Sequence, residues 1–414
     1  MRFLMLTLLA ACGPAPTPLT YAPTCADVDD VTLATTPTWS GEVGALVADR
    51  CASCHGAGGI APFPLDTYAD AAPMAGAIAA AVESRRMPPW LPASCGDCQT
   101  WAHDRSLTDL EIATLRAWSD GGAPEGTAGA AFDAPAPRAL TRIDATIDPG
   151  ADYTPPEAAE DTYRCFLTDA PSATDTFLTG YEVLPGESSV VHHVIVYQPV
   201  DDAAVASAVA LDAGEAGEGW TCYGGTGVYA EPVAIWAPGA GATVYPEGTG
   251  LPLAGGRRLV LQVHYNVENG TSPDRTRVDL TLAPTVATPA LLSSVATSDI
   301  ALPPGEPAVQ VDHVETLDVG SDFRVWGLAP HMHETGANLV FSATSHGEEV
   351  CLVDVPVWDF HWQGLYFYEE PLTLAGDSEL RLTCVYDTTG RTETTYAGEG
   401  TADEMCLVYA YVSG

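Results

Sequence analysis

Five histidines and one methionine in the second half of the chain are the residues best suited to redox chemistry. They occur in the words VVHHVIVY, LQVHYN, APHMHETG and DEMC, as His192, His193, His264, His331, His333 and Met405. Imidazole and thioether together favour copper, because soft sulfur suits Cu(I) and imidazole accepts either oxidation state. Zinc rarely takes Met, and calcium and magnesium require oxygen ligands. If the six residues form two groups of three, the chain is a two-copper redox protein.

The local sequence sets conditions on how these residues can converge. Alternate residues of a strand share a face, so His331 and His333 can bind one ion if their segment is extended, which Pro330 favours. The adjacent His192 and His193 would point to opposite faces of a regular strand, and they need a β-bulge or a strand end to converge. Taken alone, each pattern is also typical of histidines in a half-buried strand, and a single Met is typical of a core residue.

A second redox motif lies earlier in the chain. Cys51-Ala-Ser-Cys54-His55 has the C-x-x-C-H pattern of covalent haem c attachment, in which two thiols bond the haem and the imidazole binds the iron. Met87, in the proline-stiffened segment RMPPW, is the expected sixth ligand, and a Met/His pair raises the iron potential. His103 is a rival for that position. A redox-active disulfide and half of a zinc site are the competing interpretations of C-x-x-C.

The charge of the chain excludes one class of partner. The 414 residues include 55 acidic and 16 basic side chains, a formal net charge of -39, and every basic residue is Arg. Such a negative field repels phosphate backbones, so we expect no nucleic-acid partner. The acidity itself is typical of a solubilising surface.

The first residues predict export. MRFLMLTLLAAC carries Arg2 and an apolar run that is too short to span a bilayer, and it is typical of a signal peptide. LAAC resembles a bacterial lipobox, in which Cys12 is diacylated; a plain secretory signal with an incidental Cys is the alternative. We therefore expect a protein of the bacterial cell envelope or periplasm, lipid-anchored through Cys12, in a compartment where disulfides persist. No other stretch is typical of a transmembrane segment.

The rest of the chain divides into helical and strand-rich parts. Apolar residues recur at helical spacing in EVGALVADRC, AAPMAGAIAAAVESR and SLTDLEIATLRAWSDGG, and the last segment resembles the terminal helix of class I cytochromes c. From about residue 150, short runs rich in Val, Ile, Tyr and Thr alternate with turns, which predicts β-sandwiches. The expected parts are a signal peptide (1–12), a linker (13–38), an all-α cytochrome c domain (39–125), a linker (126–150) and two all-β sandwich domains (151–290 and 291–414).

The words around the six candidate ligands add a family resemblance. In the order VHHVIVY, LQVHYNV, HMH, DFHWQGLY and DEMC, they resemble the copper type II ascorbate-dependent monooxygenases over about residues 155–414. The resemblance implies two jelly-roll-like domains, with two copper ions that face each other across an open, water-filled cleft.

The resemblance also assigns a role to each group of ligands. The first group would store and deliver one electron, and it consists of His192, His193 and His264. The second group would bind the copper at which dioxygen binds and a substrate C–H bond is broken, and it consists of His331, His333 and Met405. A soft, weak Met ligand fits the second role, because it favours Cu(I) and leaves a position open for dioxygen.

Two disulfides follow from the resemblance, Cys165–Cys222 and Cys384–Cys406. With Cys12 and the haem thiols set aside, the remaining cysteines are Cys25, Cys95, Cys98 and Cys351. We expect a local disulfide within CGDC, or a bridge from it to Cys25, whereas Cys351 has no assigned partner. Spacing alone does not decide among the connectivities.

The chain departs from the peptide-amidating members of the family at two positions. Ala329 stands where they have an Arg, and Leu407 where they have an Asn, that anchor the peptide carboxylate; the Tyr is kept, as Tyr409. Loss of the bidentate cation removes the physical basis for binding a peptide C-terminus, so peptide amidation is not expected. His361 stands where the family often has Asn, and we interpret it as structural.

Together these observations predict an oxidoreductase that uses one atom of O2 to hydroxylate a C–H bond of a small organic substrate. Its cofactors would be two copper ions and one covalent haem c, and its catalytic residues His331, His333, Met405 and Tyr409. Electrons would come from an ascorbate-like reductant or a periplasmic electron-transfer protein, and the haem would pass them to the first copper. The alternative is a non-catalytic copper and haem electron-transfer lipoprotein. Either protein would meet the membrane only through its lipid anchor.

Overall fold

The computed structural model describes most of the chain downstream of the leader. The described residues are 31, 33–56, 61, 63–94, 98–133, 138–157, 161–223, 225–237, 240–267, 270–398, 400 and 402–414. The predicted signal peptide, Cys12, Cys25 and Cys95 lie outside them. None of the described helices has the length and apolar character needed to cross a membrane.

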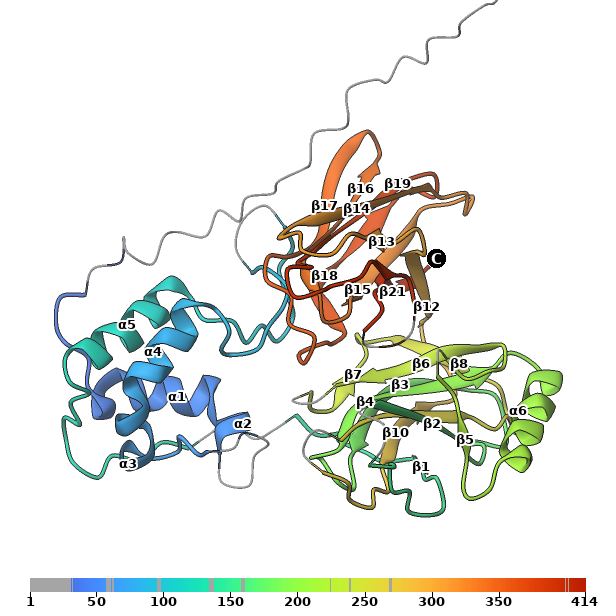
Figure 1. Cartoon of the computed structure of the whole chain (residues 1–414), viewed down its shortest axis with the longest axis horizontal. Coiled ribbons are helices and arrows are strands. Elements are labelled where there is room, and N and C mark those ends of the chain that lie inside the picture. Colours follow the sequence, from blue (N-terminus) through green and yellow to red (C-terminus); the bar gives the residue numbers. More distant parts are fainter. Residues whose placement is uncertain are drawn as a thin grey trace, which may run out of the picture.

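A bundle of short helices, at the left of Figure 1, forms the first part of the described chain. Its helices are α1 (Gly44–Arg50), α2 (Ala52–His55), α3 (Tyr68–Ala71), α4 (Ala75–Glu83) and α5 (Asp109–Asp120), with a π-helical turn at Trp39–Val43 and a 3-10 turn at Ala72–Met74. The segments with helical spacing are therefore helices. A capping box between Thr108 and Glu111 begins α5, which ends at Gly121. Trp39 and Trp118 fill the core between the helices.

Two sheets build the N-terminal β unit, drawn in green and yellow in Figure 1. Its strands are β1 (Ala145–Ile147), β2 (Asp161–Leu167), β3 (Thr176–Leu184), β4 (Val191–Pro199), β5 (Trp220–Thr221), β6 (Ala230–Trp236), β7 (Thr243–Val244), β8 (Thr249–Leu253), β9 (Val260–Asn266), β10 (Arg277–Ala283) and β11 (Thr288–Pro289). One sheet has the order β1-β10-β3-β8-β11, with β7 beside β3, and the other has the order β5-β2-β9-β4-β6. Inward residues of both sheets, such as Leu178, Val194 and Leu261, form one buried core.

The C-terminal β unit, drawn in orange and red, is a second sandwich. Its strands are β12 (Leu291–Thr297), β13 (Ala301–Leu302), β14 (Val309–Thr316), β15 (Phe323–His331), β16 (Gly336–Ser345), β17 (Glu348–Val355), β18 (Tyr366–Leu374), β19 (Glu379–Tyr386), β20 (Thr395–Tyr396) and β21 (Cys406–Ser413). The two main sheets have the orders β12-β21-β15-β18 and β14-β19-β16-β17, and β13 pairs with β20. The two sandwiches agree with the all-β prediction for this part of the chain.

One helix interrupts the N-terminal β unit, where the sequence analysis expected strands and turns. This helix, α6 (Asp202–Gly214), lies between β4 and β5. Its sequence, DAAVASAVALDAG, is rich in Ala, the strongest helix former. The Asp201 side chain accepts a hydrogen bond from Ala204 N and so caps the first turn. The all-β expectation was wrong at this point.

The segment between α4 and α5 leaves the helical bundle. Residues 88–94 and 98–102, which we call the strap, pack on the C-terminal β unit. Ala102 N donates to Phe367 O at 2.8 Å, and Glu369 N donates to Thr100 O at 3.1 Å. The strap therefore covers part of β18, which is the edge strand of its sheet, and gives hydrogen-bond partners to backbone groups that an edge would leave open.

Aromatic side chains explain why the strap leaves the helices. Trp101 is 3% exposed and belongs to the core of the C-terminal β unit, as does Leu91. The ring of Trp90 meets the ring of Tyr366 edge-on, with centroids 4.9 Å apart. The expectation that residues 39–125 form one compact unit therefore fails for the strap, because its large apolar residues are buried in a different core.

The predicted linker at 126–150 is also structured in part. Ala130 and Phe132 pack against the core of the helical bundle. Further on, β1 pairs with β10 in antiparallel register, from Ala145 opposite Leu280 to Ile147 opposite Val278. The composition suggested an open linker, but one end packs against the helical bundle and the other end pairs with β10.

Tyr411 joins the two β units. It is fully buried and belongs to the core of the N-terminal β unit although β21 is a strand of the C-terminal one. Its ring stacks on Tyr245 with centroids 4.7 Å apart, and its hydroxyl donates to Thr249 Oγ1 at 3.0 Å. Phe367 is buried in the same core. This shared packing sets the position of one unit against the other.

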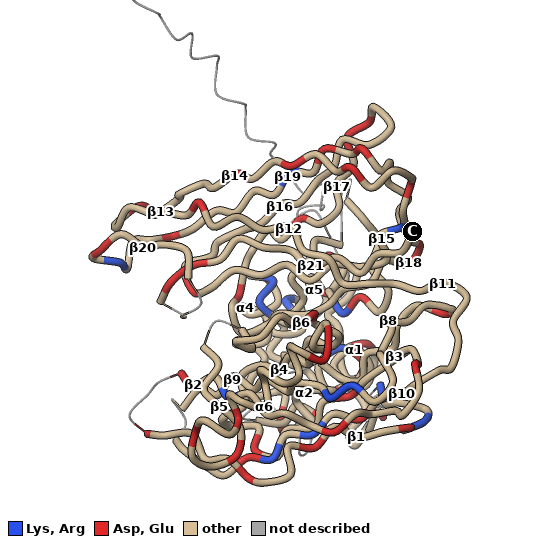
Figure 2. Tube along the Cα trace, turned by 90° about the vertical axis from the view of Figure 1, so that its right-hand side faces the viewer, with Lys and Arg blue, Asp and Glu red and all other residues tan. Residues whose placement is uncertain are grey.

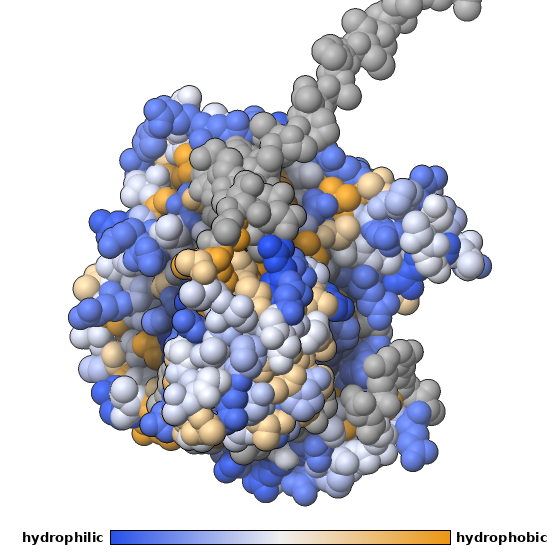
Figure 3. Space-filling model, turned by 90° about the vertical axis from the view of Figure 1, so that its left-hand side faces the viewer, coloured by the Kyte–Doolittle hydropathy of each residue, from blue (hydrophilic) through white to orange (hydrophobic). Residues whose placement is uncertain are grey.

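The surface carries the acidic excess of the sequence. Figure 2 shows Asp and Glu spread over both β units, with few Arg between them. On the face that carries the helices, hydrophilic residues separate the hydrophobic ones (Figure 3). Both views agree with a solubilising surface.

Candidate metal centres

A β-bulge brings the first three histidines together. The register of β4 against β9 shifts between Val191 and His193, so that His193 lies opposite His264 and His192 is the extra residue. This is the local distortion that the adjacent pair required. The Nδ1 atom of His264 lies 3.2 Å from that of His192 and 3.1 Å from that of His193. Each ring offers one nitrogen to a common position, with these atoms all within 4.8 Å of one another.

Asp161 fixes the orientation of the central ring. His264 is fully buried, and its Nε2 donates to Asp161 Oδ1 at 2.8 Å. The proton on Nε2 leaves the Nδ1 lone pair directed at the other two histidines. Tyr163 stacks on the same ring at 4.1 Å with an interplanar angle of 8°. A carboxylate behind a histidine is the arrangement that holds metal ligands in place and raises their basicity.

His331 and His333 form the second group at the end of β15. Met332, between them, is fully buried in the core of the C-terminal β unit, so the two histidines share the opposite side, as an extended segment predicts. Their ring centroids are 5.1 Å apart. His331 Nδ1 donates to Gln363 Oε1 at 2.5 Å, and His333 Nδ1 donates to the carbonyl of Asp403 at 3.2 Å. Both Nε2 atoms therefore keep their lone pairs for a metal.

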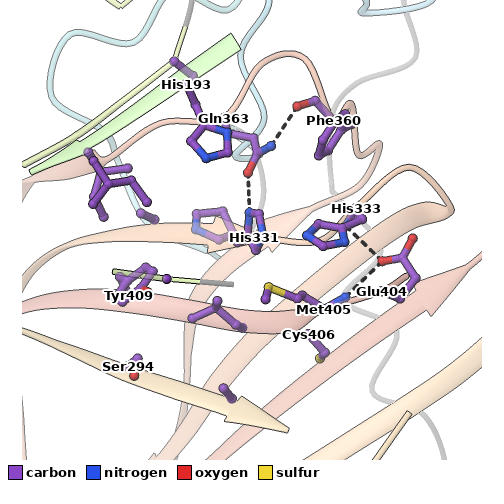
Figure 4. A pocket seen from close by; sticks show the side chains of 18 of the residues that line it. His193, Ser294, His331, His333, Phe360, Gln363, Glu404, Met405, Cys406 and Tyr409 are labelled. Carbon is purple, nitrogen blue, oxygen red and sulfur yellow. Dashed lines mark hydrogen bonds between the residues drawn. The ribbon is translucent and has the colours of Figure 1, made fainter. Parts of the chain in front are cut away.

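Met405 is the third candidate ligand of the second group. It directly precedes β21, and in Figure 4 its thioether extends toward the rings of His331 and His333. Two imidazoles and one thioether form a donor set that suits copper, as the sequence predicts.

A buried carboxylate joins the segments that carry these ligands. Glu404 is fully buried, and it accepts hydrogen bonds from His333 N at 2.9 Å and Met405 N at 3.2 Å. Its other oxygen accepts from Thr335 N at 2.7 Å and Thr335 Oγ1 at 2.6 Å. Burial raises the pKa of Glu404, and these hydrogen bonds oppose that shift. The turn after β15 and the start of β21 are thus held to one side chain.

A cavity of about 670 Å³ lies between the β units, and members of both ligand groups line it. His193 reaches it from the N-terminal β unit, and His331, His333 and Met405 reach it from the C-terminal one. Tyr409 also lines it, and Figure 4 shows these side chains around the open space. The two groups therefore share a single chamber.

Phe360 lies between the two groups. Its ring stacks on His192, with centroids 4.9 Å apart, and meets the ring of His333 at 6.0 Å. The next residue, His361, has its centroid 6.1 Å from that of His192, and its Nδ1 donates to Asp359 Oδ1 at 3.1 Å. The turn between β17 and β18 thus reaches across to the first group.

Burial keeps the imidazoles neutral. It lowers the pKa of His192 and of His331 to about 3, and neighbouring histidines add to the shift. The pKa values of His193, His264 and His333 are also lowered, chiefly by burial. A neutral imidazole is the form that binds a metal, so burial keeps these side chains in the protonation state that a metal would require.

The C-x-x-C-H motif has features that fit covalent haem. Among the described cysteines, Cys51 and Cys54 are the ones with free thiols. Burial, followed by the nearby Cys54, raises the pKa of Cys51 to about 12. His55 Nδ1 donates to Phe63 O at 3.1 Å, which leaves Nε2 available to iron. Met87 is half-buried just after α4.

Three disulfides lie among the described residues. Two are Cys165–Cys222 and Cys384–Cys406, the pairs that the resemblance implies. The third, Cys98–Cys351, corrects the expectation of a local disulfide within CGDC and gives Cys351 a partner; a bridge from Cys95 to Cys25 would lie outside the described residues. The strap carries Cys98 to the C-terminal β unit, and the bond closes a sequence separation of 253 residues.

Two domain comparisons cover most of the β-rich chain. Residues 150–272 match the N-terminal domain, and residues 287–412 the C-terminal domain, of the copper type II ascorbate-dependent monooxygenases. The chain therefore belongs to the copper type II ascorbate-dependent monooxygenase family, whose members are oxidoreductases that incorporate one atom of oxygen.

Curated relatives agree with this membership. The chain is 26% identical over 274 residues to a tyramine beta-hydroxylase of Caenorhabditis briggsae, covering 61% of this chain and 45% of the relative. It is 26% identical over 283 residues to a dopamine beta-hydroxylase of Rattus norvegicus (61% and 43%). It is 29% identical over 296 residues to a peptidyl-glycine alpha-amidating monooxygenase of Mus musculus (66% and 27%). The chain thus spans less than half the length of these relatives.

Proposed function

We propose that this protein is a copper-dependent monooxygenase that hydroxylates a C–H bond of a small organic substrate with O2. The observation that carries the proposal is the shared cavity, which His193 enters from one β unit and His331, His333 and Met405 enter from the other. Copper, when bound, would store an electron at the first group and activate dioxygen at the second. The substrates named for the relatives are amines and peptides, whereas the substrate here is proposed only as a small organic molecule.

The chain's own residues would prepare both sites. Asp161 holds the Nε2 proton of His264, so Nδ1 faces the first site. Gln363 and the Asp403 carbonyl hold the Nδ1 protons of His331 and His333, so Nε2 faces the second. The cavity between the two groups would hold the substrate.

We also propose that Cys51 and Cys54 carry a covalent haem c, with His55 and Met87 as iron ligands. The free thiols and the oriented imidazole support this assignment. The haem would accept electrons from a periplasmic donor or an ascorbate-like reductant and supply them to copper.

The strap supports an electron route toward the β units. Trp90, three residues after Met87, contacts Tyr366, whose hydroxyl donates to the carbonyl of Trp362 at 3.3 Å. The next residue, Gln363, binds His331. Trp90 is thus linked to the second group through Tyr366 and Gln363, whereas the sequence analysis expected electrons to enter at the first.

An exported location is part of the proposal. The three disulfides support an oxidising compartment, because such bonds are rare in a reducing cytosol. Lipid anchoring through Cys12 remains a proposal from the lipobox pattern, since Cys12 lies outside the described residues.

Metal content and a matched pair of substitutions test the function. Purified protein should contain two copper ions and one haem iron per chain. Met405→Leu removes the thioether at similar volume, and we expect O2-coupled hydroxylation to collapse while the haem spectrum persists. Met74→Leu, at a partly buried position packed against the core of the helical bundle, is the control and should keep the parent rate. Hydroxylation at the parent rate in Met405→Leu would overturn the role of Met405. Copper bound and reversibly reduced, with no substrate-coupled O2 uptake, would support the electron-transfer alternative instead.

A further inference from the structure

The walls of the shared cavity define a class of substrate. We infer that the cavity takes an uncharged, largely apolar molecule, and that it selects against both cationic amines and carboxylates. This inference rests on the proposed function, because it names the substrate class of the same site.

Charge is the first argument. Among the described residues that line the cavity, Glu404 is the one acidic side chain, and none is Arg. The Glu404 carboxylate is fully buried and already accepts four hydrogen bonds from His333, Thr335 and Met405. A cation would meet no free carboxylate among the described lining residues, and a carboxylate would meet no Arg there, so neither ion would regain what it loses in hydration.

The apolar wall is the second argument. Ile195 and Ile235 line the cavity from paired positions of β4 and β6, with Trp236 beside them. Leu407 and Tyr409 line it from β21. These side chains bury the apolar surface of a ligand, and a volume of about 670 Å³ is typical of a site for a small organic molecule.

The polar groups that remain are neutral. Ser294 on β12 lies opposite Tyr409 on β21, and both line the cavity (Figure 4). Hydroxyl groups can orient a neutral hydroxyl, carbonyl or amide of the ligand, but they cannot neutralise an ion. Ala329, also opposite Tyr409, occupies the place from which a longer cationic side chain would enter this part of the cavity.

The net charge of the whole molecule also disfavours anionic ligands. A net charge of -39 lowers the local concentration of carboxylates around the protein. Cations are attracted to the surface, but the described cavity walls offer them no free carboxylate. A neutral substrate is therefore the class that neither the surface nor the cavity disfavours.

A matched ligand series tests the inference on the intact, copper-loaded protein under anaerobic, reducing conditions, because Cu(I) prefers soft ligands and binds a carboxylate weakly. Equilibrium dialysis would compare propylbenzene and 3-phenylpropanamide with phenethylamine and 3-phenylpropionate, which share one phenyl chain and differ in charge. We expect the neutral pair to bind at least ~10-fold more tightly, because desolvation of an ion is not compensated. Equal or tighter binding of phenethylamine or 3-phenylpropionate would overturn the inference.

A charge introduced at Ala329 provides the converse test. Ala329→Arg should raise the affinity for 3-phenylpropionate by ~10-fold or more, because a guanidinium pairs with a carboxylate. Ala206→Arg, on the exposed face of α6, adds the same charge away from the cavity and should change nothing. If Ala329→Arg folds and leaves carboxylate binding unchanged, this wall does not contact the ligand and the inference fails. The ligand series on the parent protein still tests the inferred substrate class if that variant does not fold.

Binding and turnover separate this inference from the proposed function. Neutral ligands that bind tightly but are never hydroxylated would contradict the monooxygenase proposal and leave the substrate class intact. Hydroxylation of an amine in preference to its neutral analogue would support the monooxygenase proposal and contradict the inferred substrate class.

Discussion

Phe360 lies face to face with His192, with ring centroids 4.9 Å apart and planes inclined by 27°, although the two residues come from different β units. Phe360 also meets His333 at 6.0 Å. One side chain therefore contacts a member of each ligand group. This contact and the buried Tyr411 together hold the two groups at opposite sides of one cavity.

Phe360→Ala should loosen the link between the ligand groups. We expect a loss of ~0.5–1.5 kcal/mol in the free energy of unfolding, the usual contribution of an aromatic pair. The Cu(II) EPR spectrum of the first site should also change, since His192 loses the ring that restrains it. Phe360→Leu keeps most of the volume and is the control. An unaltered EPR spectrum in fully loaded Phe360→Ala would show that the stacking does not restrain His192.

Asp161 is expected to control copper affinity at the first site. Asp161→Asn keeps the shape of the side chain but removes the charge that accepts the His264 proton. Loss of such a partner typically lowers metal affinity ~10–100-fold, and we expect an effect in that range on the first copper only. Competition with a copper chelator would measure it. Asp318→Asn, an exposed acid on the same chain, should have no effect. Equal copper affinities in the two variants would show that Asp161 does not support the first site.

Glu404 is expected to hold the residues of the second site in position through its hydrogen bonds. Glu404→Leu leaves the N–H groups of His333, Thr335 and Met405 without an acceptor, at about 1–3 kcal/mol for each unsatisfied group. We expect a large loss of stability and loss of the copper–sulfur signal in X-ray absorption. Glu404→Gln keeps one acceptor oxygen and should restore part of both. Glu393→Gln, at an exposed position, is the control. A normal copper–sulfur signal in a folded Glu404→Leu protein would exclude the positioning role.

The Cys98–Cys351 disulfide should hold the helical bundle to the C-terminal β unit. Cys98→Ser is expected to lower the free energy of unfolding by about 2–4 kcal/mol, the usual range for a disulfide. It should also expose the strap to limited proteolysis, because the strap would then be held only by packing and by its hydrogen bonds to the C-terminal β unit. Intact mass after brief protease treatment would measure the effect. Equal resistance of parent and variant would mean that packing and hydrogen bonds hold the strap without the disulfide.

The sequence predicts local features of this protein well and distant ones poorly. The need for a bulge at His192 and His193 follows from strand geometry, and the shift in register lies there. Asp161 and Glu404 are not identified by spacing, since each acts on a partner 103 or 71 residues away. The pairing of Cys98 with Cys351 spans 253 residues. Such contacts depend on how the units pack, and no periodicity in the chain encodes them.

The buried histidines should make the copper-free protein sensitive to mild acid. Burial lowers the pKa of His192 and His331 to about 3, and it lowers those of the other three ligand histidines. Between these values and ~6.5, the unfolded chain binds protons that the folded chain does not, so stability falls as pH falls. Above pH ~7 both states are neutral at these rings, and the stability contributed by them is constant.

Two buried carboxylates should change the stability with pH in the opposite sense. They allow the assignment of the acid sensitivity to the histidines to be tested. Burial raises the pKa of Asp354 to about 6 and also raises that of Glu404, so each takes up a proton more readily in the folded protein. Five histidines outweigh two carboxylates, so we expect the free energy of unfolding to decrease from pH 7 to pH 5. Chemical denaturation at each pH would measure this slope. His331→Gln should flatten it, while Asp354→Asn should steepen it because the opposing uptake is lost. A slope that is unchanged in His331→Gln would assign the acid sensitivity to other groups.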